Sequence, residues 1–190
     1  GATHAAAIFN NEGNLKIIPL SSSITKGQHK NVAARDASKI KFYHGGDSMW
    51  KGSDVIKHAF SSRAKKWDNK ADFDYGKYLK LDEYIPFISN QDVVVDQLYN
   101  KSFGVNSILI MQMGGLLLAG DTEKYEAFSG QPPAPYVRLS GGYDDLIEKI
   151  DDVVLNWKYY CEIRAEGPRY VEKHHSPIVI AQKFIERMKR

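Results

Sequence analysis

The apolar residues of this chain come in short runs, and their length limits the fold more than any other feature of the sequence. The longest run, around residues 108–119, is interrupted by Gln112, Gly114 and Gly115. It falls short of the roughly 18–20 apolar residues that a membrane-spanning helix needs, so we expect no membrane partner. With 190 residues, of which 43% are apolar and 26% charged, the chain is expected to form one globular domain over residues 1–190.

The cysteine content and the amino terminus indicate a reducing compartment. Cys161 is the single cysteine, so no internal disulfide can form. The first residues lack the basic stretch and apolar core of a signal peptide. We therefore expect a cytoplasmic protein. Its net charge of +3 permits contact with nucleic acid but does not demand it.

The hydrophobic pattern predicts an α+β fold, in which two or more β-hairpins or short strands pack with three to four helices. The expected strands and hairpins span residues 5–20, 39–43, 75–81 and 107–120. The expected helices span residues 53–67, 92–99 and 143–163, and residues 177–190 are expected to form a helix or a strand followed by a helix. Three valines weaken the helix over 92–99, and a buried helix is the alternative over 107–120. Gly167-Pro168 is expected to break the chain, and the proline-rich stretch near residues 129–136 is the candidate subdomain connector.

The most suggestive local string is Phe42-Tyr43-His44-Gly45-Gly46, at the end of an expected strand. A histidine there can offer a directional hydrogen bond to a sugar hydroxyl, and the bare glycine backbone lets a flat ring approach closely. A second string, Asp74-Tyr75-Gly76-Lys77-Tyr78-Leu79, follows downstream, and Glu172 comes much later.

This order of His, Tyr and Glu resembles the His-Tyr-Glu class of ADP-ribosyltransferases, which includes the diphtheria-toxin-like enzymes and the poly(ADP-ribose) polymerases. The resemblance implies that NAD is the substrate and that His44 binds its ribose. It implies that Tyr78 stacks on nicotinamide and that Glu172 stabilises the charge that develops on the ribose. The residues implied to line the NAD site are Gly45, Tyr43 and Tyr75.

Several other kinds of site are disfavoured by the sequence. It contains neither a Gly-x-x-x-x-Gly-Lys phosphate loop nor a Gly-x-Gly-x-x-Gly fingerprint, and one cysteine cannot form a paired-cysteine zinc site. Glu172, His174 and His175 are close in sequence, but adjacent histidines on a strand point to opposite faces. We therefore predict no metal.

A basic stretch over residues 57–70 suggests a different function. Its cations would lie on one helix face beside Trp67, where they could meet the phosphates of a nucleic acid. The four residues of this predicted contact are Lys57, Arg63, Lys65 and Lys66. The alternative is a solvated helix face.

A third hypothesis is a non-enzymatic protein that binds a protein partner or associates with itself. It accords with the lack of strong motifs and with eleven tyrosines, since aromatic residues serve interfaces well. The sequence leaves these three functions open.

Overall fold

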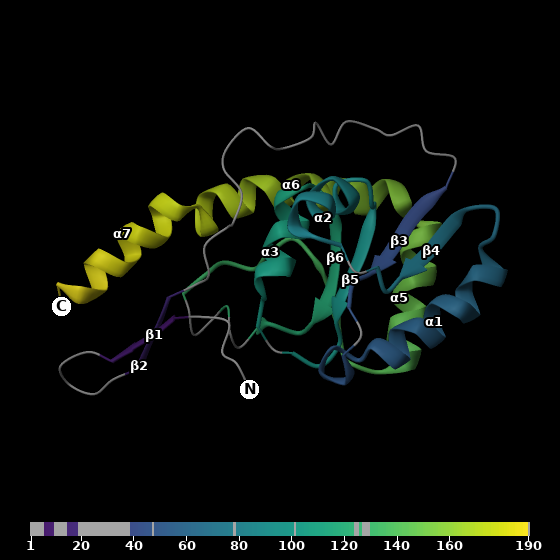
Figure 1. Cartoon of the computed structure of the whole chain (residues 1–190), viewed down its shortest axis with the longest axis horizontal. Coiled ribbons are helices and arrows are strands. Elements are labelled where there is room, and N and C mark those ends of the chain that lie inside the picture. The colour runs from purple at the N-terminus through teal and green to yellow at the C-terminus, as the bar shows by residue number, and fades with distance from the viewer. Residues whose placement is uncertain are drawn as a thin grey trace.

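The centre of the molecule is a five-stranded parallel sheet (Figure 1). The computed structural model describes residues 6–9, 15–18, 39–46, 48–77, 79–100, 102–123, 126 and 130–189. Across the sheet the strands lie in the order β4, β3, β5, β6, β7, and every neighbouring pair is parallel. Their bounds are Ile40–His44 (β3), Ala71–Tyr75 (β4), Val93–Gln97 (β5), Leu116–Gly120 (β6) and Val137–Leu139 (β7).

Helices cover both faces of this sheet, because parallel strands can be joined only by crossover connections. One face packs against α1 (Ser53–Lys66) and α5 (Tyr143–Leu155). The other packs against α2 (Leu81–Ile88), α3 (Val105–Gln112) and α6 (Trp157–His175). A short 3-10 helix, η1 (Met49–Lys51), precedes α1. The class is therefore α/β, and the predicted α+β class is correct only in that strands and helices pack together.

Burial on both faces explains why β5 was mistaken for a helix over residues 92–99. Val93 and Val95 belong to the core beneath α1 and α5, whereas Val94 faces the core beneath α2 and α3. All five residues of β5 are buried. Its three valines follow one another without alternation, so the preference of valine for strands was the better guide.

The hairpin predicted over residues 107–120 is also wrong. Its first half is the buried helix α3 and its second half is the parallel strand β6. Gly114 has a φ of 73° and follows the last turn of α3, where its N–H donates to the carbonyl oxygen of Met111. The two adjacent glycines therefore end a helix rather than turn a hairpin.

Two further boundaries differ from prediction. The edge strand β4 occupies residues 71–75 rather than 75–81, and the helix expected over 143–163 is divided into α5 and α6 at Asn156. Gly167-Pro168 does not break the chain but lies inside α6. A Cβ on Gly167 would lie 2.7 Å from the carbonyl oxygen of Met111, so this glycine lets α6 cross α3 closely.

The local predictions at the two ends of the chain are confirmed. The strands β1 (Ala6–Phe9) and β2 (Leu15–Ile18) form an antiparallel hairpin, and α7 (Pro177–Met188) follows α6. The strand over 39–43 and the helix over 53–67 are confirmed as β3 and α1. The segment between the hairpin and β3 lies outside the described residues.

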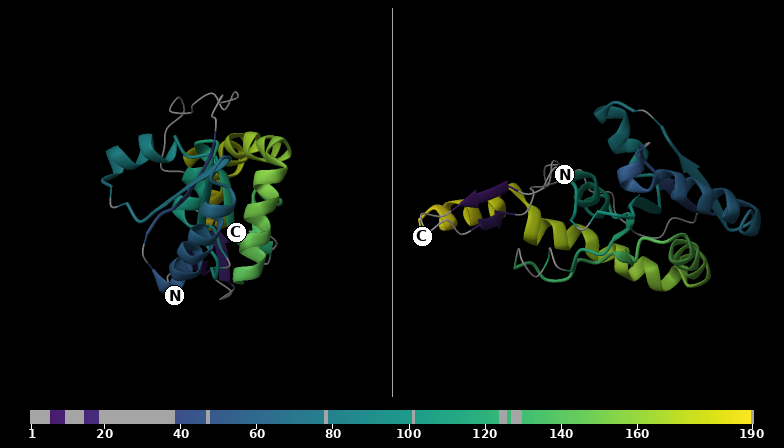
Figure 2. Two further views of the ribbon diagram at one scale, coloured as in Figure 1. Left: turned by 90° about the vertical axis from the view of Figure 1, so that its right-hand side faces the viewer. Right: turned by 90° about the horizontal axis from the view of Figure 1, so that it is seen from below.

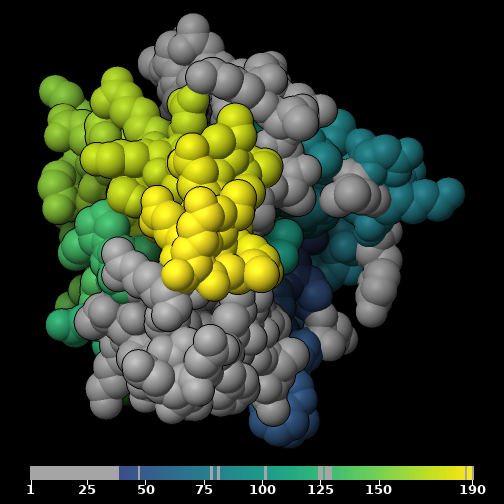
Figure 3. Space-filling model, turned by 90° about the vertical axis from the view of Figure 1, so that its left-hand side faces the viewer, coloured from purple at the N-terminus to yellow at the C-terminus, as the bar shows by residue number. Residues whose placement is uncertain are grey.

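The carboxyl-terminal helix α7 extends beside the β1–β2 hairpin (Figure 2) and stands at the surface on one side of the molecule (Figure 3). Four of its apolar side chains are exposed: Ile178, Phe184, Ile185 and Met188. The expectation of a protein partner or of self-association stays a prediction. Within the described part of the chain, no helix is both long enough and apolar enough to cross a membrane.

Candidate functional site

The order of the strands reverses between β3 and β5. From β3 the chain first adds β4 on one side and then adds β5, β6 and β7 on the other. In open parallel sheets, ligands bind outside the carboxyl ends of the strands at such a reversal. The segments that follow these two strands meet, since the N–H of Leu98 donates to the carbonyl oxygen of Lys51 at 2.9 Å. The carboxyl ends of β3 and β5 are therefore the candidate site, which we call the carboxyl-edge site.

The first turn of α3 brings free backbone amides to the carboxyl-edge site. Gly104 is the N-cap residue of this helix, no side chain caps it, and the first turn carries no acidic residue. The first amides of a helix have no partner within the helix, and its dipole is positive at that end. Val105, the first residue of α3, is 47% exposed, so this turn reaches solvent at Val105. The position favours an anion.

Lys51 supplies a cation at the same edge. Its Nζ lies 2.8 Å from Oδ1 of Asp96, and its side chain is 32% exposed while that of Asp96 is 2% exposed. Asp96 also accepts hydrogen bonds from Nδ2 of Asn106 at 2.9 Å and from Oγ of Ser107 at 2.6 Å. The buried carboxylate thus joins Lys51 to the first turn of α3.

The pKa of Asp96 reflects two opposing effects. Burial alone would raise it, because a low-dielectric environment disfavours the charged form. The Lys51 charge and the hydrogen bonds from Lys51, Ser107 and Asn106 outweigh burial and hold the pKa of this carboxyl below its ordinary value. Asp96 is therefore ionised at neutral pH.

His44, predicted to bind a ribose, is instead a completely buried residue whose ring nitrogens are both used inside the protein. Nδ1 lies 2.7 Å from the carbonyl oxygen of Val95, so Nδ1 must carry the proton and donate. Nε2 then accepts from Oγ of Ser53 at 2.8 Å, and the N–H of Ser48 donates to the same Oγ at 3.0 Å. The imidazole therefore ties β5 and the loop after β3 together.

Burial lowers the pKa of His44, and this makes the stability of the protein depend on pH. The unfolded chain takes up a proton below the ordinary histidine pKa of 6.5, while the folded imidazole resists it. The free energy of unfolding should therefore fall as pH drops below about 6.5, with a contribution from His44 of at most about 1.4 kcal/mol per pH unit. Urea denaturation between pH 7.5 and 5 measures this slope. His44→Asn should reduce the slope, and an unchanged slope would contradict the assignment.

The residues predicted around His44 have separate environments. Gly45 follows β3, and Gly46 has a φ of 98°, so the chain turns sharply at the carboxyl-edge site. Tyr43 is completely buried and packs edge to face on Phe87, with ring centroids 4.7 Å apart. Burial raises the pKa of its hydroxyl. Tyr75 is 45% exposed, and Nζ of Lys57 lies 5.7 Å from its ring centroid.

Glu172, another member of the predicted triad, does not join His44. Glu172 is an exposed residue of α6, whereas His44 is completely buried between β5 and the loop that leads into α1. An exposed carboxylate cannot share a pocket with an imidazole that is enclosed in this way. Tyr78 lies outside the described residues.

The basic stretch of α1 is partly neutralised by α5. Nε of Arg63 lies 3.0 Å and Nζ of Lys66 lies 2.7 Å from the Asp151 carboxylate, which also accepts from Nε1 of Trp67 at 2.6 Å. Lys65 is exposed. Two of the four predicted contacts with nucleic acid therefore serve to hold α1 against α5. Among the described residues no three His, Cys, Asp or Glu side chains gather as a metal site would require.

The residues that matter most at the carboxyl-edge site were missed by sequence reasoning. Lys51, Asp96 and Val105 belong to no recognised motif, and the signal that could have found them is topological. Recognition of β5 and β6 as parallel strands joined by α3 would have placed residues 96–97 and 104–105 at the reversal point.

Solved structures that share this fold include glycosyltransferases and UDP complexes. The C-terminal domain of LpcC, a group 1 glycosyl transferase family protein from Francisella tularensis, matches with a TM-score of 0.57 and 14% identity, over 83% of this chain and 96% of that domain. A point mutant of TarM from S. aureus, in complex with Fondaparinux, alpha-GlcNAc-glycerol and UDP, matches with a TM-score of 0.66 and 14% identity. Anabaena HepE with UDP and glucose matches with a TM-score of 0.57 and 14% identity.

The extent of these matches differs between the domain and the longer chains. TarM is matched over 91% of this chain and HepE over 80%, but the matches cover only 39% and 48% of those two proteins. This chain therefore spans less than half the length of TarM and HepE. No family model matches the sequence, and no curated protein sequence matches it.

These neighbours overturn the expected ADP-ribosyltransferase and, with it, the expected NAD site. The matched structures are glycosyltransferases or complexes with UDP. Within this chain, the exposed Glu172 shares no pocket with the buried His44. Neither the assembly hypothesis nor the nucleic-acid hypothesis gains support from them. The chain has the fold of the C-terminal domain of a group 1 glycosyl transferase.

Proposed function

We propose that this chain is the nucleotide-sugar-binding domain of a UDP-sugar-dependent glycosyltransferase. The observation that carries the proposal is the open, uncapped first turn of α3 at the reversal point of the sheet. Support comes from the shared fold with the LpcC domain and from UDP in the TarM and HepE complexes.

In this proposal the diphosphate of the nucleotide binds to the carboxyl-edge site. The amides of the first turn of α3 donate to phosphate oxygens, and the Lys51 ammonium lies nearby, held by Asp96. A Cβ added to Gly46 would meet nothing within 4 Å, so the loop after β3 leaves room for a ligand beside its backbone.

The same groups would favour transfer of the sugar. When the bond between the anomeric carbon and the diphosphate breaks, its electron pair stays on the phosphate oxygen, and negative charge rises there. The acceptor oxygen forms the new bond to the anomeric carbon and gives up its proton. A fixed helix dipole and a fixed ammonium stabilise the leaving diphosphate without having to reorganise.

Val105→Asp tests the proposal directly. The new carboxylate would stand in the first turn of α3, where it would repel a diphosphate, and we expect UDP to bind at least about tenfold more weakly, or about 1.4 kcal/mol. The fold should survive, because Val105 is exposed and an acid in the first turn of a helix suits its dipole. Isothermal titration of UDP into both proteins measures the change.

Ile178→Asp is the matched control. It also places a carboxylate in the first turn of a helix, α7, at a side chain that is 72% exposed and away from the carboxyl edge of the sheet. UDP should bind this variant as it binds the wild type. No binding of UDP to the wild type, or equal weakening by the two substitutions, would contradict the proposed function.

A further inference from the structure

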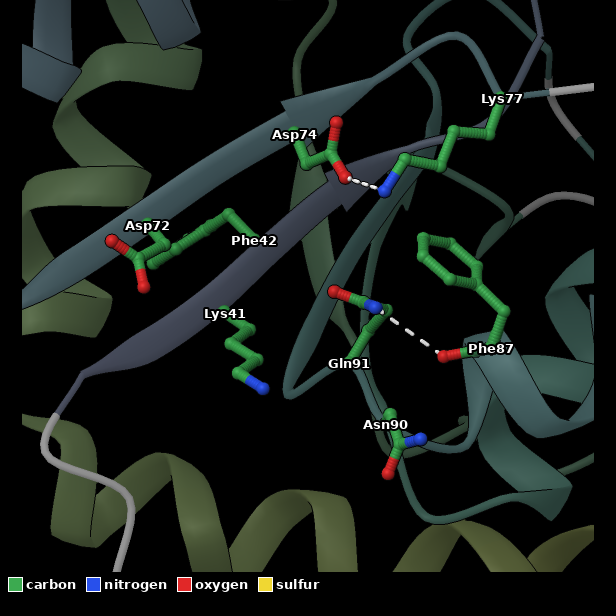
Figure 4. A pocket seen from close by; sticks show the side chains of 8 residues that line it. All are labelled: Lys41, Phe42, Asp72, Asp74, Lys77, Phe87, Asn90 and Gln91. Carbon is green, nitrogen blue, oxygen red and sulfur yellow. Dashed lines mark hydrogen bonds and ion pairs between the residues drawn. The ribbon is translucent and has the colours of Figure 1, made fainter.

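A cavity lies on the flank of the sheet, between the β3–β4 edge and the end of α2. Its volume is about 510 Å³, which is in the range of small-molecule sites. Figure 4 shows its side chains arranged around the space between β3 and the loop after α2. Its lining residues are Lys41, Phe42, Asp72, Asp74, Lys77, Phe87, Asn90 and Gln91. It shares no residue with the carboxyl-edge site, so we call it the flank pocket.

The lining of the flank pocket is strongly polar. Six of its eight residues carry charged or amide side chains. Binding of an apolar ligand would remove water from these groups, and this would cost more free energy than the apolar contacts would gain. Phe87 supplies an apolar wall, which is fixed edge to face on Tyr43. Nε2 of Gln91 donates to the carbonyl oxygen of Phe87 at 3.3 Å, and the amide points into the open space (Figure 4).

Two lysines and two aspartates line the flank pocket, and three of these four charged side chains are paired. Asp72 is paired with Lys39, with Nζ 3.1 Å from its carboxylate, and Asp74 is paired with Lys77 at 2.5 Å. Among the residues that the structure describes, Nζ of Lys41 has no hydrogen-bond or ion-pair partner. Lys41 extends into the space opposite Asn90 and Gln91 (Figure 4). Lys41 is therefore the lining cation that is available to pair with an acidic ligand.

We propose that the flank pocket binds an anionic monosaccharide. The acid group of the sugar pairs with Lys41, and its hydroxyls, which both donate and accept, bond to the carboxylate and amide groups around it. The acid group is the carboxylate of a uronic acid or the phosphate of a sugar phosphate, which share this chemistry. The inference goes beyond the proposed function, because it adds a second carbohydrate site away from the carboxyl edge of the sheet.

The test is a titration of the ¹⁵N-labelled chain, followed by two-dimensional NMR, with glucuronate, glucose 6-phosphate and glucose. We expect glucuronate or glucose 6-phosphate to shift the amides of Lys41, Asn90 and Gln91, with glucose binding at least about tenfold more weakly. The stronger of the two acids identifies the source of the charge. Shifts confined to other residues, or equal affinity for the acids and for glucose, would overturn the proposal.

Lys41→Met removes the positive charge of Lys41 without changing the fold, so it tests the role of the charge alone. The methionine keeps most of the apolar stem of a side chain that is exposed, so the chain should fold normally, which a melting curve checks. The variant should lose its preference for the acidic sugars, while Lys65→Met, on the exposed part of α1, should keep it. Retention of the preference by Lys41→Met would overturn the proposal.

The flank pocket and the carboxyl-edge site are tested independently. Lys41→Met should bind UDP as the wild type does, and Val105→Asp should bind the acidic sugar as the wild type does. A wild-type chain that binds the acidic sugar but not UDP would therefore argue against the proposed function and leave the flank pocket standing. A wild-type chain that binds UDP but not the acidic sugar would overturn the flank-pocket proposal and support the proposed function.

Discussion

Replacing Asp96 by alanine is expected to lower the free energy of unfolding by about 3–5 kcal/mol. The carboxylate is 2% exposed and accepts from Lys51, Asn106 and Ser107. Its removal leaves the Lys51 ammonium and two polar side chains without their acceptor, and the loss of one partner of a buried pair costs far more than the pair gains. Urea denaturation followed by circular dichroism at pH 7 measures the loss.

Asp72→Ala is the matched control for this substitution. Asp72 also pairs with a lysine, but its side chain is 57% exposed and water replaces the lost contact. The expected change is within about 1 kcal/mol. A loss of less than about 1 kcal/mol in Asp96→Ala, or a similar loss in both variants, would show that Asp96 does not anchor Lys51 and α3.

The parts of the fold that could be predicted from the sequence are those with a complete local signal. The β1–β2 hairpin has turn-forming residues between two apolar runs, and α1 has apolar positions at helical spacing over its whole length. The proline at residue 177 opens α7, where its missing N–H costs nothing. Each of these elements is specified by residues that are neighbours in sequence.

The parallel sheet could not be predicted in this way. A strand buried on both faces has no alternation, so β5 and β6 resembled a helix and one arm of a hairpin. Their partners lie far away in sequence, since Val93 pairs with both Phe42 and Leu116. Because β5 was assigned as a helix, the reversal of strand order could not be predicted from the sequence. Without that reversal there was no reason to consider Lys51, Asp96 and the first turn of α3.

The misassignment of His44 as a ribose-binding residue has a related cause. A histidine followed by two glycines at the end of a strand is typical of a ligand site. It is equally typical of a turn that a buried histidine stabilises through hydrogen bonds inside the protein. Burial decides between the two, because both nitrogens of His44 are bonded to groups inside the protein. Burial depends on the packing of β5 and α1 around the ring, which sequence spacing does not reveal.

Replacing Gly120 by alanine is expected to cost about 3 kcal/mol or more. A Cβ at this position would lie 2.5 Å from the carbonyl oxygen of Leu98 and 2.6 Å from that of Asn100. Both atoms belong to the backbone of the loop after β5, so no side-chain rotation can relieve the clash. Either β6 or the loop must move, and overpacking of this kind costs about 1–3 kcal/mol even where side chains can adjust. Thermal and urea unfolding of the variant measure the cost.

Gly142→Ala isolates the steric effect from the general effect of removing a glycine. Gly142 has a φ of −98°, which alanine readily adopts, and a Cβ there would meet nothing within 4 Å. The free energy of unfolding of this variant should differ from that of the wild type by no more than about 1 kcal/mol. This is the size of the free-energy contribution from the extra conformational entropy of glycine in the unfolded chain. Because the loop pressed by Gly120 leads into α3, Gly120→Ala should also weaken UDP binding in any folded fraction, whereas Gly142→Ala should leave it unchanged. A Gly120→Ala protein as stable as Gly142→Ala would mean that β6 and the loop after β5 do not pack this closely.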